Sequence, residues 1–339
     1  MKKLIGFLLA ALLLLFLANL SIGSVSIPLD QVFDILIGKT VDQKSWKNII
    51  LNFRLPRAIT AVLAGVGLSI SGLFMQTYFR NPLAGPFVLG ISAGASLGVA
   101  LVVLGGLGLG AFIQVSSPGN WTTISGAIFG SSLVFFVVLF FSGKVNNNTS
   151  LLIIGLMFSS ITSSVVGILQ YFGSAENIQF YLMWTFGDLG GVTKDELTVL
   201  IPIMLFGTVA SIFLIKPLNI LQLGESYAQN AGLNIKTTRY GIILLTALLT
   251  GTTTAFCGPV AFIGLAVPHI ARMATNTSDH RAILPVTALI GAVILLICDI
   301  ASRLPGFAQT LPLNAVTSLF GGPLVIWLIL KRKNLSFGF

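Results

Sequence analysis

The sequence has 339 residues, of which 55% are hydrophobic and only 9% are charged, whereas soluble domains carry about 25% charged residues. Nineteen Lys and Arg residues stand against ten Asp and Glu residues, so the formal net charge is +9. This composition excludes a disordered chain, a collagen-like chain and an ordinary soluble enzyme. The placement of the few charges is therefore the informative feature.

Long uncharged stretches predict membrane-spanning helices, because a bilayer core takes about 20 apolar residues per helix. The stretches without Asp, Glu, Lys or Arg are 4–29, 58–79, 81–143, 145–175, 197–215, 240–271, 282–298 and 304–330. The third is long enough for two helices, split near Gly105–Gly110 and Ser117–Gly119, and 240–271 holds one helix and a short one near 260–268. We therefore predict an all-α polytopic membrane protein with ten spans, nine full and one short.

The charges assign the two sides of this bundle. Ten spans place both termini on one side, and Lys2, Lys3 and Lys331–Lys333 predict that this side is cytoplasmic. Twelve basic and two acidic residues then lie inside, while seven basic and eight acidic residues lie outside. Topology thus explains the positive excess, and nucleic-acid binding does not. The stretch 4–29 also resembles a signal peptide, but the nine further spans favour a retained first helix.

Three polar or short segments interrupt the spans. The outer segment 22–56 is long and of mixed charge. The segment 216–239 predicts two short amphipathic helices, 218–223 and 225–231, which form either a docking surface for a soluble partner or an ordinary ordered loop. Residues 177–187 are too short to span, and their aromatic side chains favour the outer membrane interface or a re-entrant helix.

Small residues recur four positions apart in several spans. The sets are Gly65 with Ser69, Gly90 with Gly94 and Gly98, and Gly126 with Gly130. Small residues let helix backbones approach closely where lipid gives no hydrophobic drive to associate. This spacing predicts tight helix packing within the bundle.

Motifs for catalysis and metal binding are missing from the sequence. It has neither a GxxxxGK[ST] phosphate loop nor an HExxH motif, so we predict no catalytic residue, no metal site and no bound cofactor. Cys257 and Cys298 lack metal-like spacing and are interpreted as packing residues. An intramembrane enzyme built on His269 would need a second general base. An ion-coupled transporter would need an intramembrane acid, whereas Asp299 lies near a helix end and faces Arg303.

Ordered motifs along nearly the whole chain resemble the FecCD family, the permease subunits of ATP-binding cassette (ABC) importers for iron–siderophore complexes, haem and cobalamin. The motifs are RNPLAGPFVLGISAGA at 80–95, GPVAFIGLAVPHIAR at 258–272, Asp279–Arg281, Leu311–Pro312 and Gly321–Pro323. The resemblance implies a type II ABC importer permease fold as a single transmembrane domain over 1–339, with cytoplasmic coupling helices at 217–238.

The resemblance also implies an assembly and its location. The expected partners are a second permease subunit, identical or paralogous, two ATPase subunits that hold ATP and Mg²⁺, and an extracytoplasmic substrate-binding protein. The complex would lie in the bacterial cytoplasmic (inner) membrane, and the permease itself would not be an enzyme. The expected cargo is a ferric siderophore, with cobalamin or haem as the alternative, and selectivity would reside largely in the binding protein.

Three outer arginines, Arg54, Arg57 and Arg303, stand where the positive-inside rule does not require them. Arg54 and Arg57 are predicted just outside the second helix, and Arg303 at the outer end of the ninth. A guanidinium group presents a planar fork to carboxylates. The resemblance implies that these arginines dock acidic residues of the binding protein.

Two observations leave that docking role open. The arginines have an alternative role, which is pairing with lipid headgroups or with Asp299 or Asp30 of the same chain. In addition, Gln309 and Thr310 stand where the family usually has an acidic residue before Leu-Pro, which puts an acidic contact at the outer mouth in doubt.

Two cytoplasmic turns are predicted to form the gate. Pro82 ends the second helix and restricts Asn81 to extended geometry, which makes a rigid polar turn. The resemblance places the gate at Asn81 and Leu83 in this turn, and at Thr149 and Ser150 at the start of the fifth helix. The hydroxyl groups of the latter two have the alternative role of helix N-caps.

The coupling helices would sit in a groove on the ATPase and convert its closure into movement of the bundle. The predicted contacts are Gln222, Glu225, Tyr227, Ala228 and Gly232. Near the short eighth span, His269 is interpreted as a cytoplasmic hydrogen-bond anchor, and a pH switch is the alternative.

Overall fold

The computed structural model describes residues 1–39, 43–105, 120–145, 148–303 and 310–331. Within these ranges all regular structure is helical and no strand is present. The helices are α1 (Lys2–Ser21), α2 (Leu29–Leu36), α3 (Lys44–Asn48), η1 (Ile49–Arg54), α4 (Leu55–Tyr78), η2 (Pro86–Leu89), α5 (Ile91–Val103), α6 (Asn120–Lys144), α7 (Asn148–Phe172), α8 (Ala175–Thr185), α9 (Lys194–Ala210), η3 (Ser211–Leu214), α10 (Ile215–Leu221), α11 (Glu225–Asn230), α12 (Ile235–Cys257), α13 (Ile263–Thr275), α14 (His280–Ser302) and α15 (Leu313–Lys331).

Seven helical segments in the described ranges are long and apolar enough to cross a membrane. They are Lys2–Ser21, Lys44–Tyr78, Asn120–Lys144, Thr149–Phe172, Lys194–Leu221, Ile235–Cys257 and His280–Ser302. The shorter apolar helices α5 and α15, with the 13-residue α13, match the remaining predicted spans. The sequence predicts a full-length third span, but the helix found there, α5, has only 13 residues. The predicted interruptions near Gly105–Gly110 and Ser117–Gly119 fall almost wholly outside the described residues.

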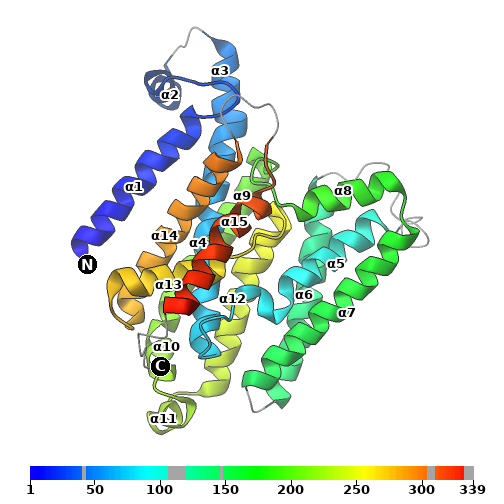
Figure 1. Cartoon of the computed structure of the whole chain (residues 1–339), viewed down its shortest axis with the longest axis vertical. Coiled ribbons are helices and arrows are strands. Elements are labelled where there is room, and N and C mark those ends of the chain that lie inside the picture. The colour runs from blue at the N-terminus through cyan, green and yellow to red at the C-terminus, as the bar shows by residue number, and fades with distance from the viewer. Residues whose placement is uncertain (40–42, 106–119, 146–147, 304–309, 332–339) are drawn as a thin grey trace.

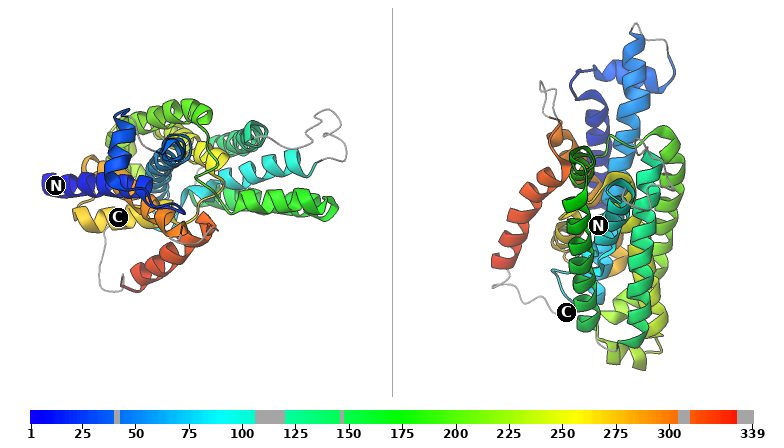
Figure 2. Two further views of the ribbon diagram at one scale, coloured as in Figure 1. Left: turned by 90° about the horizontal axis from the view of Figure 1, so that it is seen from above. Right: turned by 90° about the vertical axis from the view of Figure 1, so that its right-hand side faces the viewer.

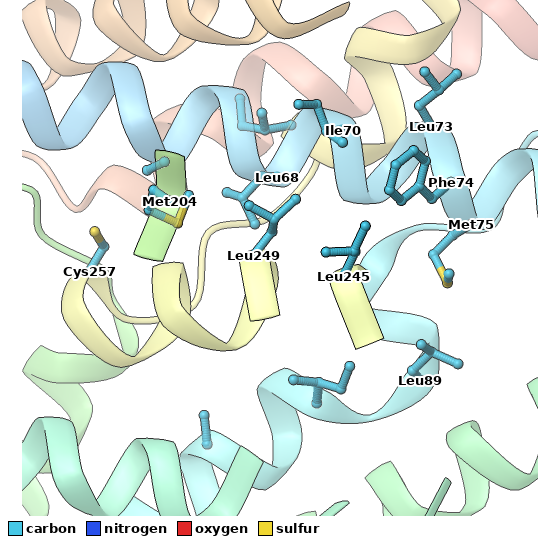
Figure 3. Packing of buried hydrophobic residues seen from close by; sticks show 14 of the residues in the cluster. Leu68, Ile70, Leu73, Phe74, Met75, Leu89, Met204, Leu245, Leu249 and Cys257 are labelled. Carbon is cyan, nitrogen blue, oxygen red and sulfur yellow. The ribbon is translucent and has the colours of Figure 1, made fainter. Parts of the chain in front are cut away.

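Helix α4 lies at the centre of the bundle and packs against α9, α12, α13 and α14. Figure 3 shows Leu68 of α4 near Met204 of α9 and Leu249 of α12, and Leu73 beside Phe74 further along α4. The inner half of α4, from Gly67 to Tyr78, is buried on every side, whereas the outer half keeps a partly exposed apolar stripe. Since α4 begins beside the outer arginines and ends at the predicted gate turn, one buried helix connects the two predicted sites.

Glycine pairs bring helix backbones into direct contact, as the sequence predicts. A Cβ atom added to Gly98 of α5 would lie 1.9 Å from the carbonyl oxygen of Gly126 in α6, and one on Gly94 would lie 2.6 Å from that of Gly130. The tightest contact is elsewhere, because a Cβ on Gly72 of α4 would lie 1.6 Å from the carbonyl oxygen of Gly264 in α13. Only glycine fits at these crossings.

The outer segment 22–56 is more ordered than its mixed charge suggests. It contains α2 and α3, and α3 runs through the π-helical η1 into α4, so that Lys44–Tyr78 is one 35-residue helical stretch. Pro56 does not end this stretch; it stands at the start of α4, where the π-helical η1 gives way to α-helix, the kind of local irregularity in which proline is accommodated. The prediction that Arg54 and Arg57 precede the second helix is therefore wrong, and both lie within it.

The opposite end of the bundle carries α10 and α11. Figures 1 and 2 show α2 and α3 at one end of the molecule and α11 at the other. Two short helices occur where 218–223 and 225–231 were predicted, but α10 continues from α9 through the 3₁₀ turn η3 instead of standing apart. Helix α8 covers most of 177–187 and is an 11-residue helix, as the shortness of that segment predicts.

Candidate docking, gate and coupling sites

Arg54 ties the connection after α1 to the start of α4. Arg54 is only 6% exposed. Its Nη1 atom donates to the carbonyl oxygens of Leu20 and Ser21, both at 2.7 Å, and its Nη2 atom donates to the carbonyl of Val25. This is a structural role, and sequence reasoning missed it because the acceptors are backbone atoms, which no residue type reveals.

Asp299 of α14 is the buried counter-ion of the other two outer arginines. The carboxylate is 0% exposed and accepts from Arg57 Nε at 2.7 Å, from Arg303 Nη2 at 2.7 Å and from Asn19 Nδ2 at 2.7 Å. A buried carboxylate requires such partners. The alternative role of pairing with Asp299 is thereby confirmed for Arg57 and Arg303. Burial lowers the pKa of the Arg303 guanidinium from its ordinary value, and Asp299 opposes that shift.

The three arginines line one pocket of about 320 Å³, at the end of the bundle that the charges predict to be the outer one. Its lining residues are Gly23, Ser24, Val25, Ile49, Phe53, Arg54, Arg57, Gly190, Arg303 and Thr310. All three charged residues of this lining are basic, and the exposed Asp188 lies 4.0 Å from Arg57 Nη1. Arg54, Arg57 and Arg303 outnumber the buried Asp299 and the exposed Asp188, so the pocket keeps an excess of positive charge. Gln309 lies outside the described residues, while Thr310 contributes to the pocket wall.

The first predicted gate turn follows the end of α4 at Tyr78. Asn81 Oδ1 accepts the N–H of Leu83 at 2.9 Å, and the Asn81 carbonyl accepts the N–H of Ala84 at 3.1 Å. His269 Nε2 of α13 lies 2.8 Å from the Pro82 carbonyl oxygen, and it donates because a carbonyl only accepts. The anchor interpretation of His269 is confirmed. Leu83 itself is 46% exposed at the tip of a firmly held turn.

The second predicted gate pair, Thr149 and Ser150, lies within the first turn of α7. The helix begins at Asn148, so these hydroxyl groups do not precede it as N-caps do. The two predicted gate elements are in contact further along the chain, where α7 meets η2. A Cβ on Gly155 of α7 would lie 2.2 Å from the carbonyl oxygen of Val88 in η2, the 3₁₀ turn that follows the first gate turn.

Polar contacts hold α10 against the N-terminus of α14. Asn219 Nδ2 donates to Asp279 Oδ1 at 2.6 Å, and Asn219 Oδ1 accepts the backbone N–H of His280 at 2.8 Å. Gln222 Nε2 donates to the carbonyl of Ser278 at 3.1 Å. The side-chain amide of Gln222 is therefore already hydrogen-bonded within the chain. Sequence reasoning missed Asn219, whose partners lie about 60 positions later.

The predicted ATPase contacts differ in their exposure. Tyr227 is 57% exposed and Leu223 is 62% exposed, so apolar surface faces outward at this end. Ala228, in contrast, is 0% exposed and packs inside the chain. Gly232 has a φ of +81° in the turn after α11, where glycine is favoured. Of these predicted contacts, Tyr227 presents the largest free surface, and Ala228 supports α11 from beneath.

Comparison with known proteins agrees with this architecture. Residues 11–331 match the FecCD transport family. The chain is 34% identical over 334 residues to the hemin transport system permease protein HmuU of Yersinia pestis, covering 98% of this chain and 97% of that protein. It is 36% identical over 288 residues to the vitamin B12 import system permease protein BtuC of Klebsiella pneumoniae, covering 84% and 83%.

Solved structures show the same fold. A structure described as an inward-facing conformation of a metal-chelate type ABC transporter superposes with a TM-score of 0.85 at 26% identity, covering 98% of this chain and 100% of that chain. The PsaBC structure from Streptococcus pneumoniae shares the fold at a TM-score of 0.57, with 16% identity. With seven span-length apolar helical segments in the described ranges and the family match over 11–331, the chain belongs to the FecCD transport family and is a membrane-embedded permease subunit of an ABC importer.

Proposed function

We propose that this permease moves a bulky metal chelate across the bacterial cytoplasmic membrane, from a binding protein at the arginine pocket to the cytoplasm at α11. The named relatives support this class, because haem and vitamin B12 are both metals held in a large organic ligand and the structural match is of metal-chelate type. Within this class a ferric siderophore stays our prediction for the cargo. Haem and cobalamin are the alternatives.

The arrangement of the two ends carries the proposal. A cationic pocket stands at one end of the apolar bundle, and the two short helices α10 and α11 stand at the other. Helix α1 runs from its N-terminus toward the pocket end, and α15 runs away from it (Figure 1). This fits a permease with both termini on the cytoplasmic side and with distinct partners on the two faces.

At the outer end, we assign docking of the binding protein mainly to Arg57. Its side chain is 15% exposed, more than the 9% of Arg303, and Arg54 is engaged with backbone carbonyls. An acidic side chain of the binding protein would offset the excess positive charge of the pocket. Arg54 and Arg303 would then shape the pocket and hold Arg57 in place.

At the inner end, α10 and α11 would lie in a groove of an ATPase subunit. ATP and Mg²⁺ would be held by that subunit, and this chain would bind no cofactor. The gate would combine the turn at Asn81 and Leu83 with Thr149 and Ser150, and a second permease subunit would complete the pathway. Permeases of this family are not enzymes themselves and work with ATPase and binding-protein partners.

The docking role of Arg57 is tested by the affinity of the complex in nanodiscs for its binding protein. We expect Arg57→Gln to weaken binding at least about tenfold, as loss of one partner of an interfacial charge pair does. Lys47→Gln is the matched control, because it removes one exposed outer charge away from the pocket. An unchanged affinity for Arg57→Gln, or an equal loss in Lys47→Gln, would overturn the assignment.

The cargo is tested by uptake into proteoliposomes that contain the complete complex and its own binding protein. Radiolabelled ferric siderophore, haem and cobalamin are compared at equal concentration. Uptake of the siderophore above the other two would support the prediction. Preferred uptake of haem or cobalamin would replace the cargo while keeping the class, and uptake of none of the three would contradict the class.

A further inference from the structure

We infer that Arg80 and Arg239 are positioning residues that connect the coupling helices to the two gate elements, Arg80 at the first gate turn and Arg239 at the end of α6, shortly before Thr149 and Ser150. This inference rests on the proposed function, since it assigns how movement of α10 and α11 reaches the gate. Neither arginine belongs to the gate or coupling residues predicted from the sequence.

Arg80 stands in the first gate turn and reaches the coupling helices. Its Nη2 atom donates to the backbone carbonyl of Gln222 at 3.0 Å, just after α10. A Cβ added to Gly224 would lie 3.6 Å from Arg80 Nη1, so the guanidinium rests on the connection between α10 and α11. One side chain thus spans from the gate turn to the junction of the two coupling helices.

The backbone of Arg80 indicates that the side chain matters. Its φ is +47°, in the left-handed region that glycine or asparagine adopts more easily. Strained backbone that persists at such a place points to a functional constraint. The neighbouring bonds from Asn81 to Leu83 and from His269 to Pro82 hold the turn together. Because the turn is held together in this way, a movement of α10 that shifts Arg80 should move the whole turn.

Arg239 makes the corresponding connection to the end of α6, which precedes the second gate pair in the chain. It lies in α12, which follows α11, and its Nη1 atom donates to the carbonyls of Ser142 at 2.9 Å and Val145 at 3.0 Å. These carbonyls end α6, shortly before α7 begins at Asn148. A cation at the C-terminus of a helix is favoured by the unpaired carbonyls there. The guanidinium also lies 5.9 Å from the ring centroid of Tyr78 at the end of α4.

A separate set of contacts keeps α10 on the bundle when Arg80 is removed. Asn219 bonds to Asp279 and to the N–H of His280, and the His280 ring lies 2.9 Å from Thr77 Oγ1 of α4. These contacts do not involve the gate turn. Removing the Arg80 guanidinium should therefore loosen the gate turn from α10 and leave the fold intact.

The first readout is the distance in the assembled complex between spin labels at Leu83 and Asn230, both of which are exposed in the single chain. Cys257 and Cys298 are buried and do not compete for the label. We expect Arg80→Gln to broaden the distance distribution between these labels and Arg80→Lys to restore part of its sharpness. An unchanged distribution in Arg80→Gln would overturn the inference for Arg80, whether or not the complex transports the expected cargo.

The second readout is the number of chelate molecules taken up per ATP hydrolysed. We expect Arg80→Gln and Arg239→Gln each to lower this ratio about tenfold while ATPase assembly is kept, the size of effect that residues along a coupling route show. Arg281→Gln removes one exposed arginine of α14 and should leave the ratio unchanged. A parallel loss of uptake and hydrolysis, or equal loss in Arg281→Gln, would contradict coupling through these arginines. Absence of uptake by the wild-type complex would contradict the proposed function, while the label distances still decide the inference.

Discussion

Asp299 and Arg303 form an ion pair one helical turn apart, with Oδ2 and Nη2 separated by 2.7 Å and the carboxylate fully buried. The same carboxylate receives Arg57 from α4 through its other oxygen, also at 2.7 Å. One acidic residue thus fixes two of the three arginines of the outer pocket and joins α4 to α14.

Replacing Asp299 with Asn should leave both arginines without their buried counter-ion. We expect the free energy of unfolding to fall by about 3 kcal/mol, because removing one partner from a buried ion pair strands the other charge. The control is Asp188→Asn, which removes an exposed carboxylate 4.0 Å from Arg57 and should cost less than about 1 kcal/mol. Unfolding in mixed micelles with a denaturing detergent measures both. Equal effects for the two variants would contradict the central position given to Asp299.

Arg54→Lys tests whether the outer connection depends on the shape of the guanidinium. An ammonium group is a point charge and cannot reproduce the planar fork that reaches the carbonyls of Leu20, Ser21 and Val25. We expect a loss of about 2 kcal/mol in the free energy of unfolding, the value of a charged hydrogen bond. The same change at the exposed Arg281 should stay within about 0.5 kcal/mol. A stable Arg54→Lys variant would show that charge alone suffices.

Gly72→Ala should disrupt the crossing of α4 and α13. The new methyl group would meet the Gly264 carbonyl oxygen at 1.6 Å, and backbone cannot move aside as a flexible side chain can. We expect a loss of about 3 kcal/mol or more in the free energy of unfolding, the upper part of the range for overpacking. Gly167→Ala in α7 meets no atom within 4 Å and should be neutral or stabilising by up to about 1 kcal/mol. Thermal unfolding of the two purified variants compares them directly, and a stable Gly72→Ala would contradict the close crossing.

Asp279 makes stability depend on pH at the start of α14. Its pKa lies below the ordinary value because its carboxylate accepts the N–H of Arg281 and the amide of Asn219. A lowered pKa in the folded state gives stability that is present above the unfolded value of about 3.9 and is lost as the pH falls through the folded value. Asp279→Asn keeps an N-cap side chain and should remove this dependence below about pH 4. Identical pH profiles of thermal unfolding for the two proteins would contradict this contribution.

Much of the fold follows from the few charges, because lipid makes a charge inside a span costly. The uncharged stretches locate the spans, and the small-residue pairs locate the crossing of Gly94 and Gly98 with Gly126 and Gly130. The same rule gives no signal for 22–56, where charge is allowed and amphipathic patterns are short. That is why α2, α3 and the extension of α4 were not predicted.

The site was most predictable where residue types pair locally. Asp299 and Arg303 are four positions apart, so their pairing was visible in the spacing, whereas the pairing of Arg57 with Asp299 across 242 positions stood only as an alternative role. Arg80 escaped prediction because its acceptor is a backbone carbonyl at Gln222, and every residue offers such a group. The burial of Ala228 could not be predicted either, because this residue lies in a polar stretch of sequence and is nevertheless 0% exposed.

As the permease of an ABC importer, the chain should meet its partners at its two ends. Uptake of radiolabelled chelate is measured in proteoliposomes that contain the purified complex, with and without ATP, binding protein and an ion gradient. We expect uptake to require both ATP and the loaded binding protein and to stay unchanged when the ion gradient is collapsed. Uptake that proceeds without the ATPase subunits and follows the ion gradient would contradict this expectation.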